Sequence, residues 1–259
     1  MSDTPIVETR EGGIHRIHFN RPKVLNAINV ATAEALRDAA RRLKDDPALR
    51  VVILSGEGRS FMAGGDISQF RDDPTSVPDT IITPLNEAMT IFAGLRAPVI
   101  ASIQGPVAGA GMSMALACDL IVAADSTRFN FAYVNLGTCC DVGASWSLPR
   151  SVGLHKALEI ALLSDPIDAT EAQRLGLVNR VVPADHLRDE TDKLAQRLAQ
   201  GAPVAQGVLK QLMRRSFERD FASQLEAERQ GFGTCAATAD FQEAVNAFLE
   251  KRPATYQGR

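Results

Sequence analysis

Three stretches of the chain combine small residues with polar groups that could serve chemistry: residues 60–67, 105–114 and 129–146. In the first, Gly64 and Gly65 follow an apolar run, and glycines in such a turn can present bare backbone N–H groups to a ligand. The same pair would also make a tight strand-to-helix turn that binds nothing. Both interpretations stay open for this stretch.

The second stretch is typical of a helix that starts directly after a strand. The first N–H groups of such a helix have no internal partner, and the helix dipole adds partial positive charge, so an anion or a developing oxyanion could sit there. Close packing of helix on strand explains the small residues equally well. Gly109-x-Gly111 is half of a dinucleotide-binding fingerprint, but Met114 stands where the third glycine belongs. Ser113 lacks the following glycine of a serine-hydrolase elbow, so that class is excluded too.

The third stretch contains a single carboxylate, Asp141, among apolar and small residues. If it is buried, desolvation raises its pKa and makes it a useful proton shuttle. The alternative is an N-cap for the helix that carries Trp146, and the local residues alone favour that alternative. Cys139 and Cys140 have no neighbouring histidine or lysine, so we predict small buried packing residues rather than nucleophiles.

These stretches need a scaffold, and short apolar runs predict it. Residues 51–54, 99–103 and 120–123 are almost entirely apolar, which is typical of strands buried on both faces. They alternate with helical patterns, one of them capped by Asn29, so we expect β-α units with parallel pairing. A further strand is predicted over residues 14–20.

Polar and capping signals complete the predicted organisation. We expect a mobile surface loop at 71–80, a last strand at 177–182, and capping boxes at Asp168-x-x-Glu171 and Asp240-x-x-Glu243. Four amphipathic helices are predicted after these, over residues 184–200, 203–217, 219–235 and 239–250. A boundary near 201–203 divides the chain into a core of residues 1–200 and a helical region of residues 201–259.

The composition excludes several classes of protein. The chain has 259 residues, 45% of them hydrophobic, and a net charge of −3, which gives no electrostatic reason to expect nucleic acid or an acidic membrane as partner. No apolar run is long enough to span a bilayer, and no secretory signal is evident. The 4 cysteines and 4 histidines form no metal-binding spacing. We therefore expect a cytoplasmic protein with no metal and no separate cofactor.

Several motifs spaced along the chain act together. In order, they are Asn20-Arg21-Pro22-x-x-x-Asn26-Ala27, Phe61-x-Ala63-Gly64-x-Asp66, Gly105-x-x-Ala108-Gly109-x-Gly111, Ala117-Cys118-Asp119, Asn135-Leu136-Gly137 and Phe248-x-Glu250-Lys251-Arg252-Pro253. This set resembles the crotonase family, also called the enoyl-CoA hydratase/isomerase superfamily, over nearly the whole chain.

The resemblance implies an α/β fold: a spiral of ββα repeats with a helical C-terminal trimerisation region, binding acyl-CoA thioesters as a homotrimer or a dimer of trimers. It assigns the two oxyanion-hole amides to Gly65 and Ala110. Residues assigned to the acyl-CoA site by the same resemblance are Lys23, Leu25, Ala63, Asp66, Ile67, Ser113, Tyr133, Phe232 and Lys251. Phe232 and Lys251 match positions that often reach the CoA of a neighbouring subunit, and CoA enters as part of the substrate.

Departures from the family pattern point to the reaction. The two glutamates of family hydratases align with Ser113 and Tyr133, and neither is a carboxylate. Asp141 matches the acid of the Δ3,Δ2-enoyl-CoA isomerases, and especially of the bacterial phenylacetate-pathway isomerase type. The resemblance thus implies a double-bond shift with Asp141 as proton shuttle, because one carboxylate beside an oxyanion hole suffices for it. An atypical hydratase, an acyl-CoA hydrolase and a non-catalytic CoA-binding homologue are the alternatives.

Overall fold

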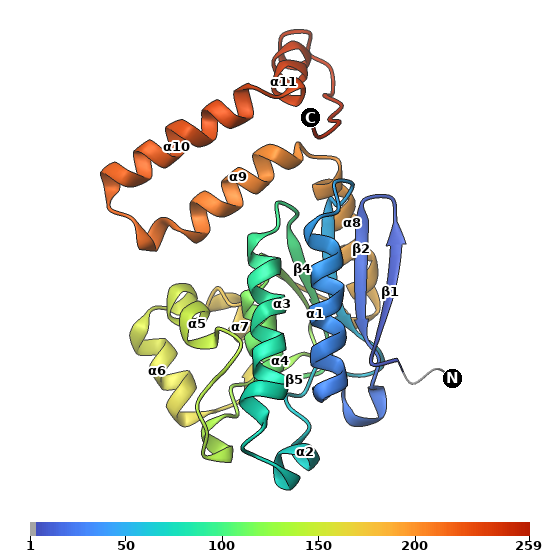
Figure 1. Cartoon of the computed structure of the whole chain (residues 1–259), viewed down its shortest axis with the longest axis vertical. Coiled ribbons are helices and arrows are strands. Elements are labelled where there is room, and N and C mark those ends of the chain that lie inside the picture. The colour runs from blue at the N-terminus through green and yellow to red at the C-terminus, as the bar shows by residue number, and fades with distance from the viewer. Residues whose placement is uncertain (1–3) are drawn as a thin grey trace.

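Two β-sheets form the centre of the molecule, with helices covering the larger one on both faces (Figure 1). The computed structural model describes residues 4–259. The larger sheet has six strands in the order β1-β2-β3-β4-β6-β9, all parallel except the β1–β2 pair. They are β1 (Ile6–Glu11), β2 (Ile14–Phe19), β3 (Val51–Gly56), β4 (Val99–Ile103), β6 (Leu120–Ala124) and β9 (Arg180–Val182).

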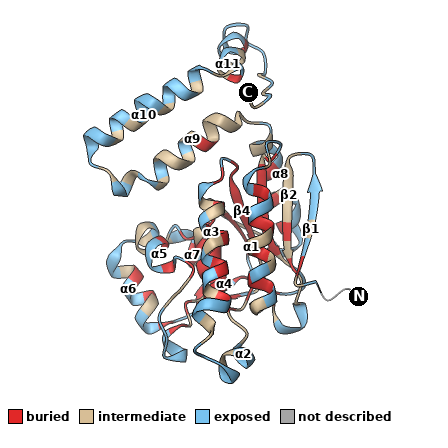
Figure 2. Cartoon of the chain, viewed as in Figure 1, coloured by how far each residue is buried: buried red, intermediate tan, exposed pale blue. Residues whose placement is uncertain are grey.

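The central strands are buried on both sides, which confirms the interpretation of the apolar runs (Figure 2). On one face they pack against α1 (Val30–Lys44) and α3 (Thr83–Gly94). On the other face, Val51, Ile53, Ile100 and Val122 pack against α8 (Leu187–Ala199). Strand β1 was not predicted, because its mostly exposed sequence lacks an apolar run.

The smaller sheet consists of β5 (Pro106–Ala108), β7 (Arg128–Asn130) and β8 (Ile167–Asp168). The chain passes from β4 in the larger sheet to β5 in the smaller one and then into α4 (Ala110–Ala117). It repeats that path from β6 to β7 and onward to α5 (Ala144–Val152) and α6 (Leu154–Leu163). This repetition confirms the expected spiral of ββα units.

Local capping signals were mostly interpreted correctly. The Asn29 side chain accepts a hydrogen bond from the Thr32 N–H and starts α1. Asp168 does the same for α7 (Ala169–Arg174). The capping box predicted at Asp240 is wrong: Thr238 caps that helix, and the buried Asp240 carboxylate instead accepts hydrogen bonds from the N–H groups of residues 257 and 258.

The predicted loop at 71–80 is only partly correct. These residues lie at the surface, but they include the end of α2 (Ile67–Asp72) and most of a π-helical turn, Pro78–Ile82. Short 3-10 turns occur at Pro22–Val24, Val134–Leu136, Ala184–His186 and Ser216–Glu218. Within residues 4–259, no helix is both long and apolar enough to cross a membrane.

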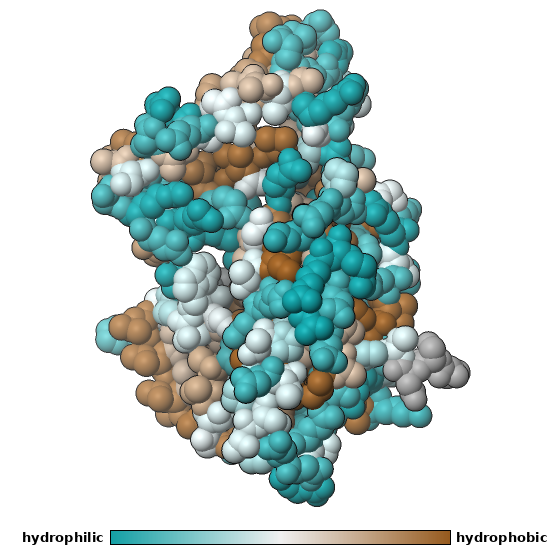
Figure 3. Space-filling model, in the orientation of Figure 1, coloured by the Kyte–Doolittle hydropathy of each residue, from teal (hydrophilic) through white to brown (hydrophobic). Residues whose placement is uncertain are grey.

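The C-terminal helices form an arm at one end of the molecule (Figure 1). They are α9 (Pro203–Arg214), α10 (Phe221–Ala236) and α11 (Ala239–Leu249), close to the predicted ranges. Apolar side chains on this arm are widely exposed (Figures 2 and 3): Leu209, Met213, Phe217, Phe221, Leu225, Phe232, Phe248 and Leu249. The division into residues 1–200 and 201–259 stays a prediction, but exposed large apolar side chains are much denser after residue 200 than before it.

Candidate active site

Two glycine-containing turns lie in main-chain contact. Met62 and Val107 form a parallel bridge, and the Ala108 N–H donates to the Met62 carbonyl at 3.1 Å. A Cβ placed on Gly64 would lie 3.3 Å from the Ala108 carbonyl oxygen, and Gly64 has φ +105°. The absence of a side chain therefore allows the turn before α2 to lie against the segment that leads into α4.

The two predicted oxyanion donors, Gly65 and Ala110, come just after these contacting residues in the chain. Neither the Gly65 N–H nor the Ala110 N–H donates to any acceptor in the described part of the chain, although the adjacent Asp66 N–H donates to the Ile28 carbonyl at 2.8 Å. Ala110 is the first residue of α4, where amides lack an intrahelical acceptor and the dipole favours negative charge. Both amides are thus available to a ligand oxygen.

Asp141 is tied to the same helix through two side chains. It lies in the turn before α5, and its carboxylate Oδ1 accepts a short hydrogen bond from the Tyr133 hydroxyl. The Tyr133 hydroxyl oxygen lies 2.7 Å from the Ser113 Oγ, which is on α4 one turn after Ala110. Two successive hydrogen bonds therefore connect Asp141, through Tyr133, to Ser113 in the first turn of α4.

The environment of Asp141 is that of a partly buried acid. Burial raises the pKa of Asp141, and the hydrogen bond from Tyr133 opposes that rise. Its side chain does not cap α5, because Gly143 occupies the N-cap with no side-chain bond, so the capping interpretation is wrong. Ser113 and Tyr133 are buried, and burial raises the pKa of Tyr133, so that its phenol stays protonated.

Two of the predicted CoA contacts, Leu25 and Ala63, lie side by side next to the turn that contains Gly64 and Gly65. The Leu25 carbonyl accepts a hydrogen bond from the Ala63 N–H at 3.0 Å. Lys23 and Ile67 are exposed. Asp66 pairs with Arg21 at 2.9 Å and accepts from the Ser68 hydroxyl at 2.7 Å, and both contacts lower the pKa of Asp66. Its contact with acyl-CoA stays a prediction.

Asn26 is a residue of this site whose role the sequence did not reveal. It is buried and has φ +58°, a conformation that asparagine tolerates better than most residues. Its side chain accepts from the Arg21 N–H and donates to the carbonyls of Glu57 and Ser60 at 3.0 and 2.8 Å. Asn26 thereby holds the turn at Leu25 against residues 57–60, the loop that precedes Gly64 and Gly65. The sequence signal that could have indicated this role was the presence of Asn26 in the first of the spaced motifs.

Phe232 and Lys251 lie apart from these groups. Both are exposed and belong to the C-terminal arm, which Figure 1 shows at the end of the molecule opposite α2. Phe232 packs edge-on against Phe241 with ring centroids 5.8 Å apart. The single chain therefore does not bring these two residues to the glycine turns.

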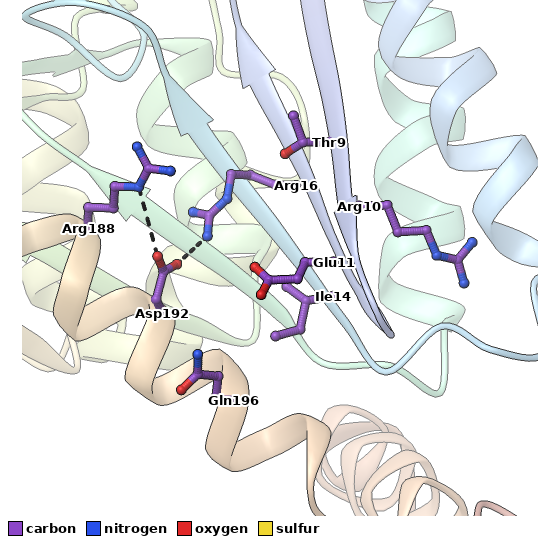
Figure 4. Close-up of a pocket in the computed structure, with 8 residues that line it drawn as sticks. All are labelled: Thr9, Arg10, Glu11, Ile14, Arg16, Arg188, Asp192 and Gln196. Atoms are coloured by element: carbon purple, nitrogen blue, oxygen red, sulfur yellow. Dashed lines mark hydrogen bonds and ion pairs between the residues drawn. The ribbon is translucent and has the colours of Figure 1, made fainter.

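A cavity of about 410 Å³ contains none of the predicted site residues (Figure 4). It lies between β1, β2 and α8, where Asp192 pairs with both Arg16 and Arg188. Arg10 points away from that cluster and pairs with Asp46 at 2.7 Å. Arg16 and Arg188 share the Asp192 carboxylate there, and none of the glycine-turn residues lines this cavity, so we do not assign the chemistry to it.

The cysteines differ in part from expectation. Cys139 is exposed and Cys140 half-buried, so the prediction that both are buried is wrong for Cys139. In the region spanning residues 4–259, no three histidine, cysteine or acidic side chains cluster as metal ligands would.

Known proteins resemble this chain over almost its whole length. The family model described as Enoyl-CoA hydratase/isomerase matches residues 9–259. The chain is 35% identical to a protein named probable enoyl-CoA hydratase from Mycobacterium bovis, over all of both chains. It is 33% identical to the 1,2-epoxyphenylacetyl-CoA isomerase of Escherichia coli, covering 96% of this chain and 97% of that one. A solved enoyl-CoA hydratase from Bacillus anthracis superposes with a TM-score of 0.94 at 29% identity, covering 98% and 100% of the two chains. This protein belongs to the enoyl-CoA hydratase/isomerase family, the crotonase superfamily.

Proposed function

We propose that this protein is an acyl-CoA isomerase that moves a carbon–carbon double bond along an unsaturated acyl chain. The Gly65 and Ala110 N–H groups hold the thioester oxygen, and Asp141 carries the proton. The observation that supports this most directly is the hydrogen-bonded connection from Asp141 through Tyr133 to Ser113 on α4. It links the acid to the helix whose first amide is a free donor.

The proposed reaction needs one base and one oxyanion site. Asp141 removes a proton from the carbon next to the carbonyl, and the electron pair moves to the thioester oxygen to form a dienolate. The protonated acid then returns the proton to the far end of the dienolate. Loss of one backbone donor in such a site typically costs about 3–4 kcal/mol of barrier, so two donors contribute substantially.

Hydration is the second candidate, and the names of several relatives favour it. Water addition in family hydratases uses two glutamates, whose positions are Ser113 and Tyr133 here. Both are neutral hydroxyl groups at neutral pH, and Ser113 is fully buried. Asp141 would have to act without a second carboxylate, which favours the isomerase.

The test compares the wild type with Asp141→Asn on 3-enoyl-CoA and 2-enoyl-CoA substrates. We expect 3-enoyl-CoA to be isomerised, and the variant to lose about 10²–10⁴-fold in kcat, the usual contribution of a general base. Asp185→Asn is the control, because that side chain is 81% exposed and far along the chain from the site. Full isomerase activity in Asp141→Asn would refute the proposal. Water addition to 2-enoyl-CoA at a matching rate would favour the hydratase, and a trapped ester on Asp141 would favour the hydrolase.

We also propose that the chain assembles as a homotrimer or a dimer of trimers in the cytoplasm. The exposed apolar side chains of the C-terminal arm support assembly, since monomers rarely expose so many together. The distance of Phe232 and Lys251 from the glycine turns of their own chain supports their contact with CoA in a neighbouring subunit. Acyl-CoA remains the proposed ligand, with no separate cofactor.

A further inference from the structure

The proposed mechanism uses Asp141 but gives no task to Tyr133 and Ser113, although both are buried polar groups. The Ser113 side chain is fully buried, and Tyr133 is 7% exposed. Burial of hydroxyl groups is unfavourable unless they are hydrogen-bonded, so their arrangement has a defined hydrogen-bond order.

Counting hydrogens establishes that order. Tyr133 has one hydroxyl hydrogen, and an ionised carboxylate can only accept, so Tyr133 donates to Asp141 Oδ1. In the 2.7 Å contact between Ser113 and Tyr133, Ser113 must therefore be the donor. Its other acceptor, the Gly109 carbonyl at 3.2 Å, is more distant. The hydrogen bonds run from Ser113 to Tyr133 and from Tyr133 to Asp141.

This order leaves the two carboxylate oxygens unequal. Tyr133 supplies the one side-chain hydrogen bond that Asp141 receives within the described chain, and it goes to Oδ1. Oδ2 receives none from a side chain, so it is the more basic of the two oxygens and the one that takes up a proton. The phenol hydrogen stays on Tyr133, because burial and the negative charge of Asp141 raise the pKa of Tyr133.

Resting on the proposed isomerase function, we propose that Tyr133, oriented by Ser113, is a positioning residue that occupies Oδ1 and commits Oδ2 to removing and returning the proton. In the first step the C–H bond breaks, the O–H bond forms at Oδ2, and the electron pair enters the dienolate. In the second step the O–H bond breaks and the new C–H bond forms. No oxidant or further reactant is needed, and Tyr133 loses no proton.

Few other charges act on Asp141, so the effect of Tyr133 is separable. Helix α4 has no charged residue, and the 3-10 turn Val134–Leu136 has none. The one charged residue of α5, Arg150, stacks on Trp146 at 4.1 Å from the ring centre. Cys139 and Cys140 precede Asp141 in its own turn and are the other titratable groups there. Removing the Tyr133 hydroxyl therefore leaves burial, which raises the pKa of Asp141, opposed only by the backbone hydrogen bond of Asp141 itself.

Activity requires ionised Asp141, so kcat/KM rises with pH as this acid loses its proton. Tyr133→Phe removes the bond that lowers the pKa of Asp141, and the acid limb of the profile moves to higher pH. Ser113→Ala keeps the Tyr133 bond but removes its orienting donor, so it moves the limb in the same direction by less.

The experiment measures kcat/KM of the full chain from pH 5 to 10 with 3-enoyl-CoA, and deuterium uptake into product in D₂O. We expect Tyr133→Phe to lose about tenfold on the acid limb, the effect of one hydrogen bond to a charged group, with a smaller loss at high pH. Deuterium uptake should increase, because a less fixed acid exchanges its proton with solvent before returning it. Tyr256→Phe removes the same hydroxyl from the only other tyrosine and should match the wild type.

Two outcomes distinguish failure of this inference from failure of the isomerase assignment. If Tyr133→Phe and Ser113→Ala both overlay the wild-type profile and deuterium uptake while Asp141→Asn is inactive, the positioning role is wrong and the isomerase assignment stands. If Asp141→Asn is fully active, the isomerase assignment itself is wrong. Circular dichroism and Tm confirm folding, and Ser113→Ala tests the inference independently should Tyr133→Phe fail to fold.

Discussion

Asp119 joins the C-terminal arm to the larger sheet through buried charge. Its carboxylate, between α4 and β6, accepts from Lys210 Nζ and from Arg214 Nη2, each at 2.7 Å, and from the Val99 N–H at 2.8 Å. The exposed side-chain fractions are 15% for Asp119, 6% for Lys210 and 19% for Arg214. Asp119→Asn preserves the shape of the side chain but leaves two cations on α9 without their counter-charge.

The size of the effect follows from burial. Removing one partner of a buried ion pair typically costs about 3–5 kcal/mol, because the remaining charge stays buried and unpaired. We expect that loss in the free energy of unfolding, which corresponds to a fall in Tm of about 6–20 °C. Lys210 retains the carbonyls of Phe92 and Ala97 as acceptors, so we expect the loss of stability to lie near the lower end of this range.

The comparison variant is Glu190→Gln, which removes an ion pair of the same length. Glu190 and Lys193 are also 2.7 Å apart, but Lys193 is 70% exposed. Exposed pairs contribute at most about 1 kcal/mol, so this variant should unfold close to the wild type. Urea denaturation, monitored by circular dichroism, measures the free energy of unfolding of both variants. The defect of Asp119→Asn should also diminish at high pH, because burial lowers the pKa of Lys210 and the neutral amine needs no partner. Equal small losses in the two variants, or no relief at high pH, would refute the reasoning.

Two further predictions concern stability near the site. Burial raises the pKa of Asp141 above its unfolded value, so the folded state binds more protons and stability falls as pH rises through that window. Asp141→Asn should therefore be more stable than the wild type at neutral pH, with the difference shrinking toward pH 4 in thermal melts; a variant less stable at every pH would contradict this. A Cβ on Gly111 would lie 2.2 Å from the Met62 carbonyl oxygen, whereas one on Gly94 meets nothing within 4 Å. Gly111→Ala should lower Tm and activity strongly while Gly94→Ala leaves Tm equal or slightly higher; matching melting curves would show that the contact at Gly111 is not tight.

Local sequence was sufficient for much of the scaffold. The apolar runs that became β3, β4 and β6 could only be buried on both faces, and that requirement predicts parallel strands covered by helices. The prediction that Asn29 caps a helix is confirmed, because capping is decided within one helical turn. The same local logic failed at Asp240, where the chain end supplies N–H groups from residues 257 and 258 that no local pattern could reveal.

The chemistry depended on contacts between distant segments. The residues around Asp141 favoured a helix cap, and only the fold brings Tyr133 and Ser113 to this carboxylate, the latter from 28 residues earlier in the chain. The sequence by itself determined which small residues could expose an amide and which acid could hold a proton, because these are properties of residue type. The tertiary structure decided that the glycine turn before α2 lies against the start of α4, and that a buried hydroxyl pair orients Asp141. Burial and hydrogen-bond direction depend on packing, and packing exists only once the chain has folded.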